Sequence, residues 1–402
     1  MKYTFIEEIE LGSKSALMKL NILRHFILNG EATLPELGKG MDVSVPTVTK
    51  VVSDLIDDGF VVDFGKVETT GGRRPNNYGL NPSSGYFLGV DLKRFRVNVA
   101  LIDFKGEIVE SQFNIDFLYE NTQDSFDKLC NIINQFIDNL SIPKSKILSA
   151  GINISGRVDA KSGHSYSNYC FSEKPLNEVF KERLGMHVTI DNDSRSMAYG
   201  EYMQGAGNAQ KNVFFINVSW GLGLGLIVDG KLYYGKSGFS GEFGHINAFD
   251  NEIICHCGKK GCLETEASGS FVHRRFLEKI AEGNSSILDS RINNNETITL
   301  EDILDAANHD DMLAIELIEV VGQNLGKHIS TLINLFNPDC VIIGGSLALT
   351  GDYLLLPIRS AVKRYSLNLI SKDTQILLSE LGDEAGIIGA CLLARSKMLG
   401  LV

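Results

Sequence analysis

Apolar side chains recur at helical spacing in the N-terminal part of the chain. Residues 13–29 carry one such stripe, and Thr33 and Ser44 are placed to cap two further helices, a short one over 34–39 and a longer one to about residue 58. A proline in the first turn of each capped helix fits this assignment. The side chains expected to be buried are Leu17, Leu20, Ile22, Leu23, Phe26 and Ile27 in the first helix and Val48, Val51, Val52, Leu55 and Ile56 in the third.

Two short segments of alternating polarity, residues 60–64 and 77–80, follow as expected strands. Between them, residues 69–75 contain two glycines, two arginines and a proline, as an exposed turn does. A short helix, a turn and a longer helix form the helix-turn-helix pattern, to which the strands add a wing. The alternative is a small helical interaction domain whose arginines are only solvated. The residues expected to contact DNA are Ser44, Pro46, Thr47, Thr49, Lys50, Arg73 and Arg74.

Beyond a linker at 81–85, apolar strands alternate with segments of helical period. Turns that contain glycine follow several of these strands. This order predicts an α/β protein with a ligand-binding cleft at the ends of the strands. Strands are expected at 87–90, 97–102, 147–154, 188–190, 213–228 (as a pair) and 340–343, and helices at 126–140, from 193 to 201, within 268–336 and near 385–398.

The composition allows two or three domains, since the chain has 402 residues with an ordinary apolar content of 44%. A formal net charge of −12 argues against indiscriminate binding to nucleic acid or anionic lipid. It does not exclude a small DNA-reading domain, although residues 1–82 carry nine Lys and Arg against eleven Asp and Glu. A dimer would be needed to gather enough phosphate contacts.

Neither a run of eighteen apolar residues nor a signal sequence is recognisable, so we expect no membrane association. Of the seven cysteines, three lie close together and four are scattered in apolar surroundings. This usage suits a reducing cytoplasm. The scattered cysteines are Cys130, Cys170, Cys340 and Cys391.

The clustered cysteines lie in one short segment, with a histidine upstream. His245, Cys255, Cys257 and Cys262 supply the four ligands that a tetrahedral zinc site needs. Two glycines inside the segment allow the backbone to turn tightly enough to bring them together. Four protein ligands would complete the coordination shell, so such a zinc would be structural. The alternatives are three buried thiols, or a disulfide that leaves one cysteine unpaired.

Two carboxylates flank this cluster. A zinc ion would hold the segments that carry Glu242 and Glu264 side by side. If one ring nitrogen of His245 binds the metal, the other is a fixed N–H donor. Two carboxylates and one such donor are suited to the vicinal hydroxyls of a sugar. The alternative is that both glutamates are ordinary surface charges.

With these motifs the chain resembles the ROK family of repressors, open reading frames and kinases, nearly from end to end and in the manner of its N-acetylglucosamine and xylose repressors. The resemblance is carried by the G-E-x-G-H block at 241–245, the C-x-C-G-x-x-G-C-L-E block at 255–264 and the G-G-R-R-P sequence at 71–75. It implies a winged helix-turn-helix followed by an actin-like, two-lobed sugar-kinase fold. It also implies zinc on His245, Cys255, Cys257 and Cys262, and sugar contacts from Asn192, Asp193, Glu242, His245 and Glu264.

Departures from the pattern of the family's kinases bear on whether the protein is a sensor or a kinase. The segment 91–96 lacks the glycines that would wrap nucleotide phosphates, and Phe95 stands in place of a threonine. Ser219 and Trp220 replace the Gly-Thr that opens a second phosphate turn, although three glycines follow. Phosphoryl transfer depends mostly on positioning and neutralising the phosphates, so we expect no enzyme activity.

Asp193 matches the catalytic base of the family's kinases. An aspartate that orients a hydroxyl serves binding equally well, so we expect no catalytic residue in this chain. Arg195 stands where the family has a small residue. We expect it to pair with a neighbouring acid, the alternative being an anionic ligand.

The expected organisation is a DNA-binding domain at 1–82, a small lobe at 83–190 completed by the C-terminal helix near 385–402, and a large lobe at 191–384 with the zinc site and oligomerisation helices. The first hypothesis is a homodimeric or homotetrameric repressor of carbohydrate-utilisation genes, in which cleft closure around a sugar changes the spacing of two DNA-binding domains. The second is an ATP-dependent sugar kinase with an appended DNA-binding domain. The third is a regulator whose effector is a partner protein.

Overall fold

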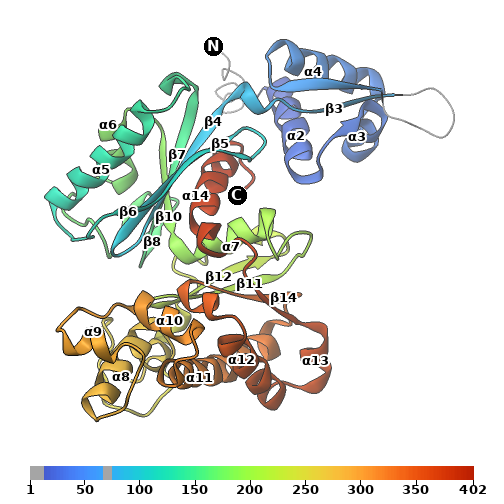
Figure 1. The fold of residues 1–402 in the computed structure, drawn as a ribbon. Helices are drawn as coiled ribbons and strands as arrows, with labels where there is room; N and C mark the ends of the chain where they lie inside the picture. The colour runs from blue at the N-terminus through green and yellow to red at the C-terminus, as the bar shows by residue number, and fades with distance from the viewer. Residues whose placement is uncertain (1–12, 67–74) are drawn as a thin grey trace. The chain divides into compact units, whose positions relative to one another are not determined.

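A computed structural model describes residues 13–66 and 75–402 (Figure 1). The described residues belong to two compact units. The first unit comprises Met1–Ile152, Asn177–Thr189 and Cys391–Val402, and the second comprises Asn153–Leu176 and Ile190–Ala390. Each unit is therefore built from segments that are distant in the sequence.

Three capped helices open the first unit and confirm the three expected ones. Each follows a Ser or Thr whose side-chain oxygen accepts a hydrogen bond from a backbone N–H of the first turn. The second helix is two residues longer than predicted, because the chain leaves it only at Asp42, in the left-handed conformation. The helices are α2 (Lys14–Asn29), α3 (Leu34–Met41) and α4 (Val45–Asp57), capped by Ser13, Thr33 and Ser44.

The buried faces of these helices differ from the prediction at three positions, one of which, Ile27, is half-buried, while the other two are exposed. Leu17 is 47% exposed and Ile56 is 36% exposed, and in α2 Ala16 is buried instead. Both exposed residues lie at the edge of an apolar stripe, where a helix turns side chains toward solvent. The predicted positions that are buried are Leu20, Ile22, Leu23, Phe26, Val48, Val51, Val52 and Leu55.

A three-stranded antiparallel sheet in the order β1-β3-β2 accompanies the helices. β2 and β3 confirm the two expected strands, whereas β1 is too short to show alternation in the sequence. The predicted turn between β2 and β3, with Arg73 and Arg74, lies outside the described residues. The strands are β1 (Ala32–Thr33), β2 (Val61–Lys66) and β3 (Asn76–Leu80).

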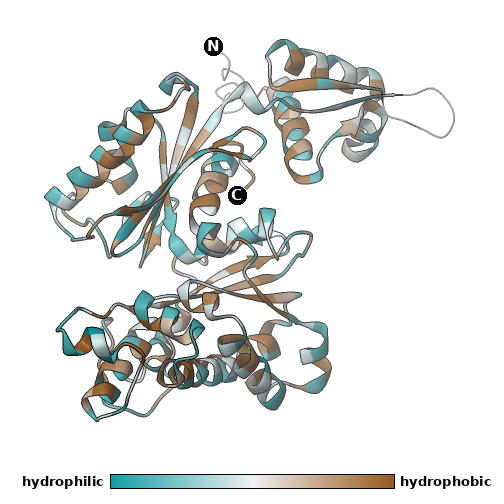
Figure 2. Cartoon of the chain, viewed as in Figure 1, coloured by the Kyte–Doolittle hydropathy of each residue, from teal (hydrophilic) through white to brown (hydrophobic). Residues whose placement is uncertain are grey.

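A five-stranded sheet follows in the order β10-β7-β4-β5-β6. The edge strand β6 was not predicted, because most of its side chains are exposed and it lacks an apolar run. α5 (Gln123–Asp138) buries one apolar face, which is brown in Figure 2. The strands are β4 (Tyr86–Leu92), β5 (Arg96–Asp103), β6 (Ile108–Asp116), β7 (Ile147–Ile154) and β10 (Val188–Asn192).

The second unit contains a five-stranded sheet in the order β13-β12-β11-β14-β15. β11 pairs antiparallel with β12 and parallel with β14. Helices share one buried apolar cluster with this sheet, so the predicted α/β class is confirmed. The elements are β11 (Val213–Val218), β12 (Leu222–Val228), β13 (Lys231–Leu232), β14 (Cys340–Gly344), β15 (Gln375–Leu378), α8 (Gly269–Ala281), α10 (Leu300–Asn308), α11 (Met312–Phe336) and α12 (Asp352–Tyr365).

Smaller elements connect these layers. α12 was not predicted, because Pro357 lies inside it and a proline argues against a helix. The remaining elements are α6 (Leu176–Leu184), α7 (Asp193–Gln204), α9 (Asp289–Asn293), α13 (Asn368–Asp373), β8 (Val158–Asp159), β9 (His164–Ser165) and the 3₁₀ turns η1 (Pro82–Ser84), η2 (Lys144–Lys146), η3 (Phe243–His245), η4 (Leu263–Glu266), η5 (Ser346–Thr350) and η6 (Gly382–Glu384).

The C-terminal helix α14 (Ala385–Met398) begins in the second unit and ends in the first. Just past its end, the guanidinium of Arg24 in α2 donates hydrogen bonds to the carbonyl oxygens of Leu399, at 2.9 Å, and Gly400, at 2.7 Å. A cation at this end satisfies carbonyls that have no partner inside the helix and complements the helix dipole. α2 is thereby anchored to the end of α14.

The expectation for the scattered cysteines is met in part. Cys130, Cys340 and Cys391 are buried, but Cys170 is exposed, so its predicted apolar surroundings are wrong. Among the described residues, none of the helices combines the length and the apolar character that a bilayer span requires.

Candidate functional site

β12 supports the residues that were expected to bind a sugar. Gly221, just before the strand, and Gly223 and Gly225 within it lie at alternate positions and therefore share one face. A Cβ atom on Gly223 would lie 2.1 Å from Ser194 Oγ, and one on Gly225 would lie 2.4 Å from Ala198 Cβ. The glycines thus allow the first turns of α7 to pack directly on the strand. This packing requires glycine whether or not a phosphate binds nearby.

The same strand positions Glu264. A Cβ atom on Gly221 would lie 2.8 Å from Glu264 Oε2, and the Leu222 N–H donates to that oxygen at 2.9 Å. Gly244 also lies close to β12, since a Cβ atom there would be 2.4 Å from the Leu222 carbonyl oxygen. η3 and η4, which carry His245 and Glu264, therefore both pack against β12.

Asn192 and Asp193 lie at the start of α7. Asn192 caps the helix, with its Oδ1 accepting from the Arg195 N–H at 3.1 Å. Its Nδ2 donates to the Gly156 carbonyl at 3.0 Å and to Asp193 Oδ1 at 2.9 Å. These bonds fix both side chains before any ligand binds. All five residues expected to contact sugar lie in the second unit.

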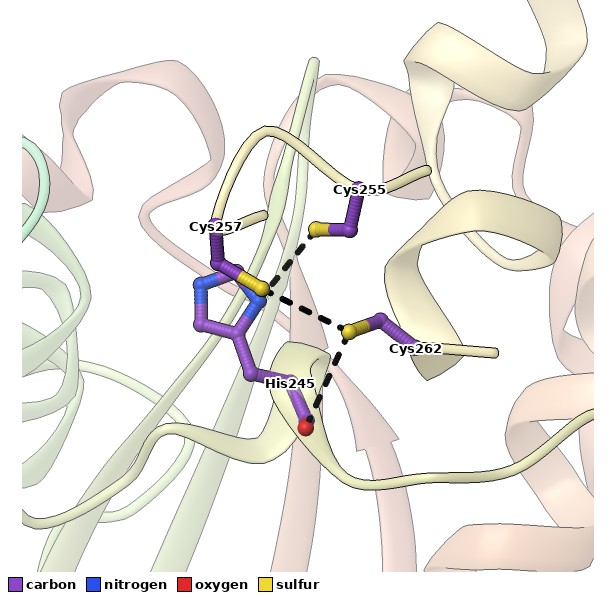
Figure 3. A group of neighbouring side chains, drawn as sticks. All are labelled: His245, Cys255, Cys257 and Cys262. Atoms are coloured by element: carbon purple, nitrogen blue, oxygen red, sulfur yellow. Dashed lines mark hydrogen bonds between the residues drawn. The ribbon is translucent and has the colours of Figure 1, made fainter. Parts of the chain in front are cut away.

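The four predicted metal ligands are close together. Figure 3 shows the His245 ring and the three sulfur atoms turned toward one another. His245 Nδ1 lies 3.6 Å from Cys255 Sγ, Cys257 Sγ lies 3.6 Å from Cys262 Sγ, and all four ligand atoms lie within 4.8 Å of one another. Ligand atoms on one tetrahedral zinc are separated by roughly 3.5–3.8 Å. The cluster therefore has the dimensions of a metal site.

The local backbone explains how a short segment places three sulfurs together. Gly258 and Gly261 have φ values of 85° and 74°, in the left-handed region that favours glycine. All three cysteines of the cluster are free thiols, so the disulfide alternative is not realised. Cys257 is half-buried, which distinguishes the cluster from a set of three buried core thiols.

The two carboxylates at the cluster have different environments. Glu242 is exposed, and its Oε2 lies 3.7 Å from His245 Nε2, the ring nitrogen that faces away from the sulfurs. Glu264 is only 8% exposed, so it is not an ordinary surface charge. Burial alone would raise the pKa of Glu264, but hydrogen bonds from His256 and from the Leu222 amide hold it below its usual value. Glu264 is therefore a buried, ionised acceptor.

His256 belongs to this group, although it was not predicted. Its Nδ1 lies 2.9 Å from Glu264 Oε1, and its ring lies edge-on to that of His245. Its position between Cys255 and Cys257 was the available signal, because neighbours of metal ligands in so short a segment cannot lie far from the site.

Arg195 pairs with an acid, as expected. The buried side chain donates from Nε to Asp191 Oδ1 at 2.8 Å. Its two terminal nitrogens donate to the carbonyl oxygens of Gly238 and Val158, each at 2.7 Å. Tyr234 donates to the other oxygen of Asp191 at 2.9 Å. Arg195 thus ties α7 to the loop that leads into Glu242 and is occupied without a ligand.

Trp220 and Ser219, which stand in place of the Gly-Thr of the second phosphate turn, both have contacts within the second unit. The half-buried indole of Trp220 packs against His273 of α8, with ring centroids 5.4 Å apart, and against the apolar core. The Ser219 hydroxyl donates to Asn217 at 2.7 Å and accepts from the Ser346 N–H. Both residues therefore stabilise the turn that follows β11. In the first unit, Phe95 at the β4–β5 turn is exposed.

The residues expected to contact DNA lie on one face of α4, as far as the structure describes them. All five that belong to the described part of the chain are exposed, and Arg73 and Arg74 lie outside it. Val45, also exposed, was missed because an apolar residue at the start of a helix resembles a core position. The five are Ser44, Pro46, Thr47, Thr49 and Lys50.

The ROK family model matches residues 87–397, and the chain belongs to this family. An N-acetylglucosamine repressor of Escherichia coli O6:H1 (strain CFT073) is 30% identical over 398 residues, 98% of this chain and 96% of that protein. A putative xylose repressor of Caldicellulosiruptor sp. (strain Rt8B.4) is 29% identical over 386 residues, 95% of this chain and 96% of that protein.

A crystal structure of a ROK family transcriptional regulator, a homologue of the Mlc protein of E. coli, has a TM-score of 0.80 at 28% identity and covers 96% of this chain and 98% of its own. Kinases are related as well. A glucokinase of Halalkalibacterium halodurans is 29% identical over 325 residues, 78% of this chain and 96% of the kinase. The resemblance to the ROK family and to its repressors is thereby confirmed.

Proposed function

We propose that this protein is a sugar-responsive transcriptional regulator that represses carbohydrate-utilisation genes. The observation that carries the proposal is similarity to repressors over nearly the whole chain, whereas the glucokinase covers only 78% of it. A regulator needs both a DNA-reading segment and an effector site, and the chain contains a candidate for each.

The proposed DNA-binding domain is residues 1–82. α3, the turn at Asp42 and α4 would form the helix-turn-helix, and β2 and β3 the wing. The exposed start of α4 supports this proposal, because small side chains and one cation, Lys50, suit a helix that enters the major groove. The methyl groups of exposed Val45 suit contact with a thymine methyl.

The proposed sugar site consists of Asn192, Asp193, Glu242, His245 and Glu264. Their side chains offer carboxylate acceptors and one imidazole N–H, a combination that recognises the hydroxyls of a sugar. The packing of α7, η3 and η4 on β12 supports the assignment, since preorganised groups lose little entropy on binding.

Zinc is the proposed metal at His245, Cys255, Cys257 and Cys262. Three thiols and one imidazole form a donor set that zinc prefers, and four protein ligands leave no open position for catalysis. When bound, the metal would supply structural support alone. His245 would offer Nδ1 to the metal and its Nε2–H to the sugar.

Sugar phosphorylation is the alternative that we disfavour. Asp193 occupies the position of a kinase base, but glycines at 221, 223 and 225 serve packing and so give no support for phosphate binding. We propose that Asp193 orients a sugar hydroxyl without taking its proton. A regulator that senses only a protein partner would not need the five polar side chains proposed to bind sugar.

The proposed assembly is a homodimer or homotetramer bound to operator DNA. A single DNA-binding domain with so few cations would gather too few phosphate contacts. Residues 83–190 with 385–402 would form the small lobe, and residues 191–384 the large lobe with the oligomerisation helices. A two-fold assembly would present two such domains to one operator.

The test is operator binding by the purified full chain with and without sugars. DNA from upstream of neighbouring carbohydrate-utilisation genes is the probe, measured by fluorescence anisotropy with D-glucose, N-acetyl-D-glucosamine or D-xylose. We expect one sugar to change the operator affinity by about 5–150-fold, the usual range for coupled sites. Operator binding that ignores every sugar would contradict the sensing role, and ADP formation from ATP with a sugar would support the kinase.

A further inference from the structure

His256 lies at the proposed sugar site in a way that the expected ligand set does not include. Its Nδ1 lies 2.9 Å from Glu264 Oε1. The centroid of its ring is 5.1 Å from that of His245, with the ring planes at 70°. One side chain therefore contacts both His245 and Glu264, two of the residues proposed to bind sugar.

The partner of Nδ1 determines what the other ring nitrogen can do. A carboxylate oxygen only accepts, so Nδ1 of His256 carries the hydrogen. Nε2, the ring nitrogen that does not face Glu264, is then the atom that can form a hydrogen bond with a ligand. The His256 side chain is 71% exposed, whereas that of Glu264 is 10% exposed. Most of the imidazole is therefore accessible to a ligand while its Nδ1–H holds a buried carboxylate.

The hydrogen bonds of Glu264 place a bound hydroxyl next to His256. Oε2 accepts a hydrogen bond from the Leu222 N–H, and it lies where it would contact a Cβ atom on Gly221. Oε1 accepts from His256 and, over a long contact of 3.8 Å, from Cys255 Sγ. A sugar hydroxyl that binds Oε1 would share this oxygen with His256 and so lie beside the imidazole.

We propose that His256 contacts the sugar directly and determines which sugar is bound. Its Nε2 forms a hydrogen bond with a hydroxyl of the ligand, while Nδ1–H holds Glu264 in place. This inference rests on the proposed sugar-binding function. A site that pairs a polar group with a ligand hydroxyl discriminates strongly against ligands lacking that hydroxyl, because the site group is then left unpaired. His256 occupies an unspecified position in the C-x-C-G-x-x-G-C-L-E block, so a change there leaves the proposed metal ligands intact.

The test is isothermal titration calorimetry of the full chain with D-glucose, N-acetyl-D-glucosamine and D-xylose. His256→Ala should weaken binding of the preferred sugar by about ten-fold or more. It should also reduce the differences in affinity among the three sugars. His256→Asn keeps a donor near the place of Nδ1 but has no counterpart of Nε2, so it should bind as weakly as His256→Ala. Lys260→Ala is the matched control, because Lys260 is in the same segment but pairs with Glu252.

Each outcome has a defined meaning. Zinc content and sugar-free operator affinity should equal those of the wild type in all three variants, which separates loss of contact from loss of fold. Wild-type affinities and preference in His256→Ala would overturn the inference and leave the proposed function standing. Recovery in His256→Asn would overturn the direct contact, since support of Glu264 would then suffice. A wild-type chain that binds none of the sugars would count against the proposed function, and the inference about His256 would fall with it.

Discussion

Arg195 is a cation with almost no access to water. Its side chain is 4% exposed, and that of its partner Asp191 is 3% exposed. Each charge is stabilised by the other, because a single buried charge would lose its hydration without any compensating interaction. The remaining donors of Arg195 are used by the carbonyl groups of Gly238 and Val158. The pair therefore connects three segments of the second unit that approach the proposed sugar site.

The first prediction concerns this pair. Arg195→Met should lower the free energy of unfolding by about 3–5 kcal/mol, because it leaves Asp191 charged and buried without its partner. The double variant Arg195→Met with Asp191→Asn should recover part of that loss. Urea denaturation of the three proteins measures both effects. A loss below about 1 kcal/mol in Arg195→Met would show that water reaches Asp191 and that the pair is not buried in solution.

At the level of elements, β12 and α7 make the closest contact in the proposed site. The first turn of α7 can approach only because Gly223 has no side chain. Gly223→Ala would introduce a Cβ atom 2.1 Å from Ser194 Oγ, so the start of the helix must move.

The second prediction follows from this contact. Gly223→Ala should weaken sugar binding by about ten-fold or more, because displacement of even 1 Å at a positioned group is costly. Adding Ser194→Gly removes the obstructing atoms and should restore part of the affinity. Calorimetry with the preferred sugar measures both variants. Full affinity in Gly223→Ala would contradict the view that this packing positions Asn192 and Asp193.

The third prediction concerns the metal. Cys262→Ser should abolish zinc binding, weaken sugar binding and lower the midpoint of thermal unfolding by several degrees, because the cluster holds η3 and η4 together. Operator binding without sugar should persist, since the N-terminal helices have their own buried residues. Zinc content by mass spectrometry and a thermal scan provide the measurements.

The control for the metal prediction is Cys170→Ser, which removes an exposed thiol outside the cluster. This variant should keep the zinc content and the midpoint of the wild type. If purified wild-type protein contains no zinc, and adding zinc leaves its midpoint unchanged, the cluster is not the metal site that we propose.

The elements and residues that sequence alone predicted are those with a strong local signal. A capping residue predicts a helix such as α4, and an apolar run predicts a buried strand such as β7. β6 was missed because an exposed edge strand lacks such a run. α12 was missed because the sequence pattern around Pro357 argues against a helix. His256 was missed for another reason. Its place between two predicted metal ligands indicated that it lies near the site, but its contact with Glu264, eight positions away, is visible only in the structure.

On the scale of the whole molecule, α14 is the helix shared by both units. Near its start Gly389 approaches α7 so closely that a Cβ atom there would lie 1.9 Å from the Ser196 carbonyl oxygen. Beyond its end, Leu399 and Gly400 accept hydrogen bonds from Arg24. Within the second unit, α14 therefore contacts α7, and within the first unit its end contacts α2. We expect sugar binding and operator binding to be coupled through this helix, and a coupling free energy measures that effect.

The final prediction is that Arg24→Ala uncouples the two proposed binding functions. Sugar affinity should remain that of the wild type, because Arg24 lies in the other unit from Asn192 and Glu264. Operator affinity without sugar should change little, since Arg24 is not on the exposed start of α4. The factor by which sugar changes operator affinity should fall at least about five-fold, because the two hydrogen bonds that anchor α2 to α14 are lost.

Fluorescence anisotropy with the operator, with and without the preferred sugar, measures that factor. Lys19→Ala is the matched control. Lys19 is also in α2, but it pairs with Asp58 inside the proposed DNA-binding domain, so its loss should leave the sugar effect intact. Because coupling between two sites is reciprocal, operator DNA should also lose its effect on sugar affinity in Arg24→Ala. An undiminished sugar effect in that variant would mean that Arg24 only caps α14 and that the signal reaches α2 by another route.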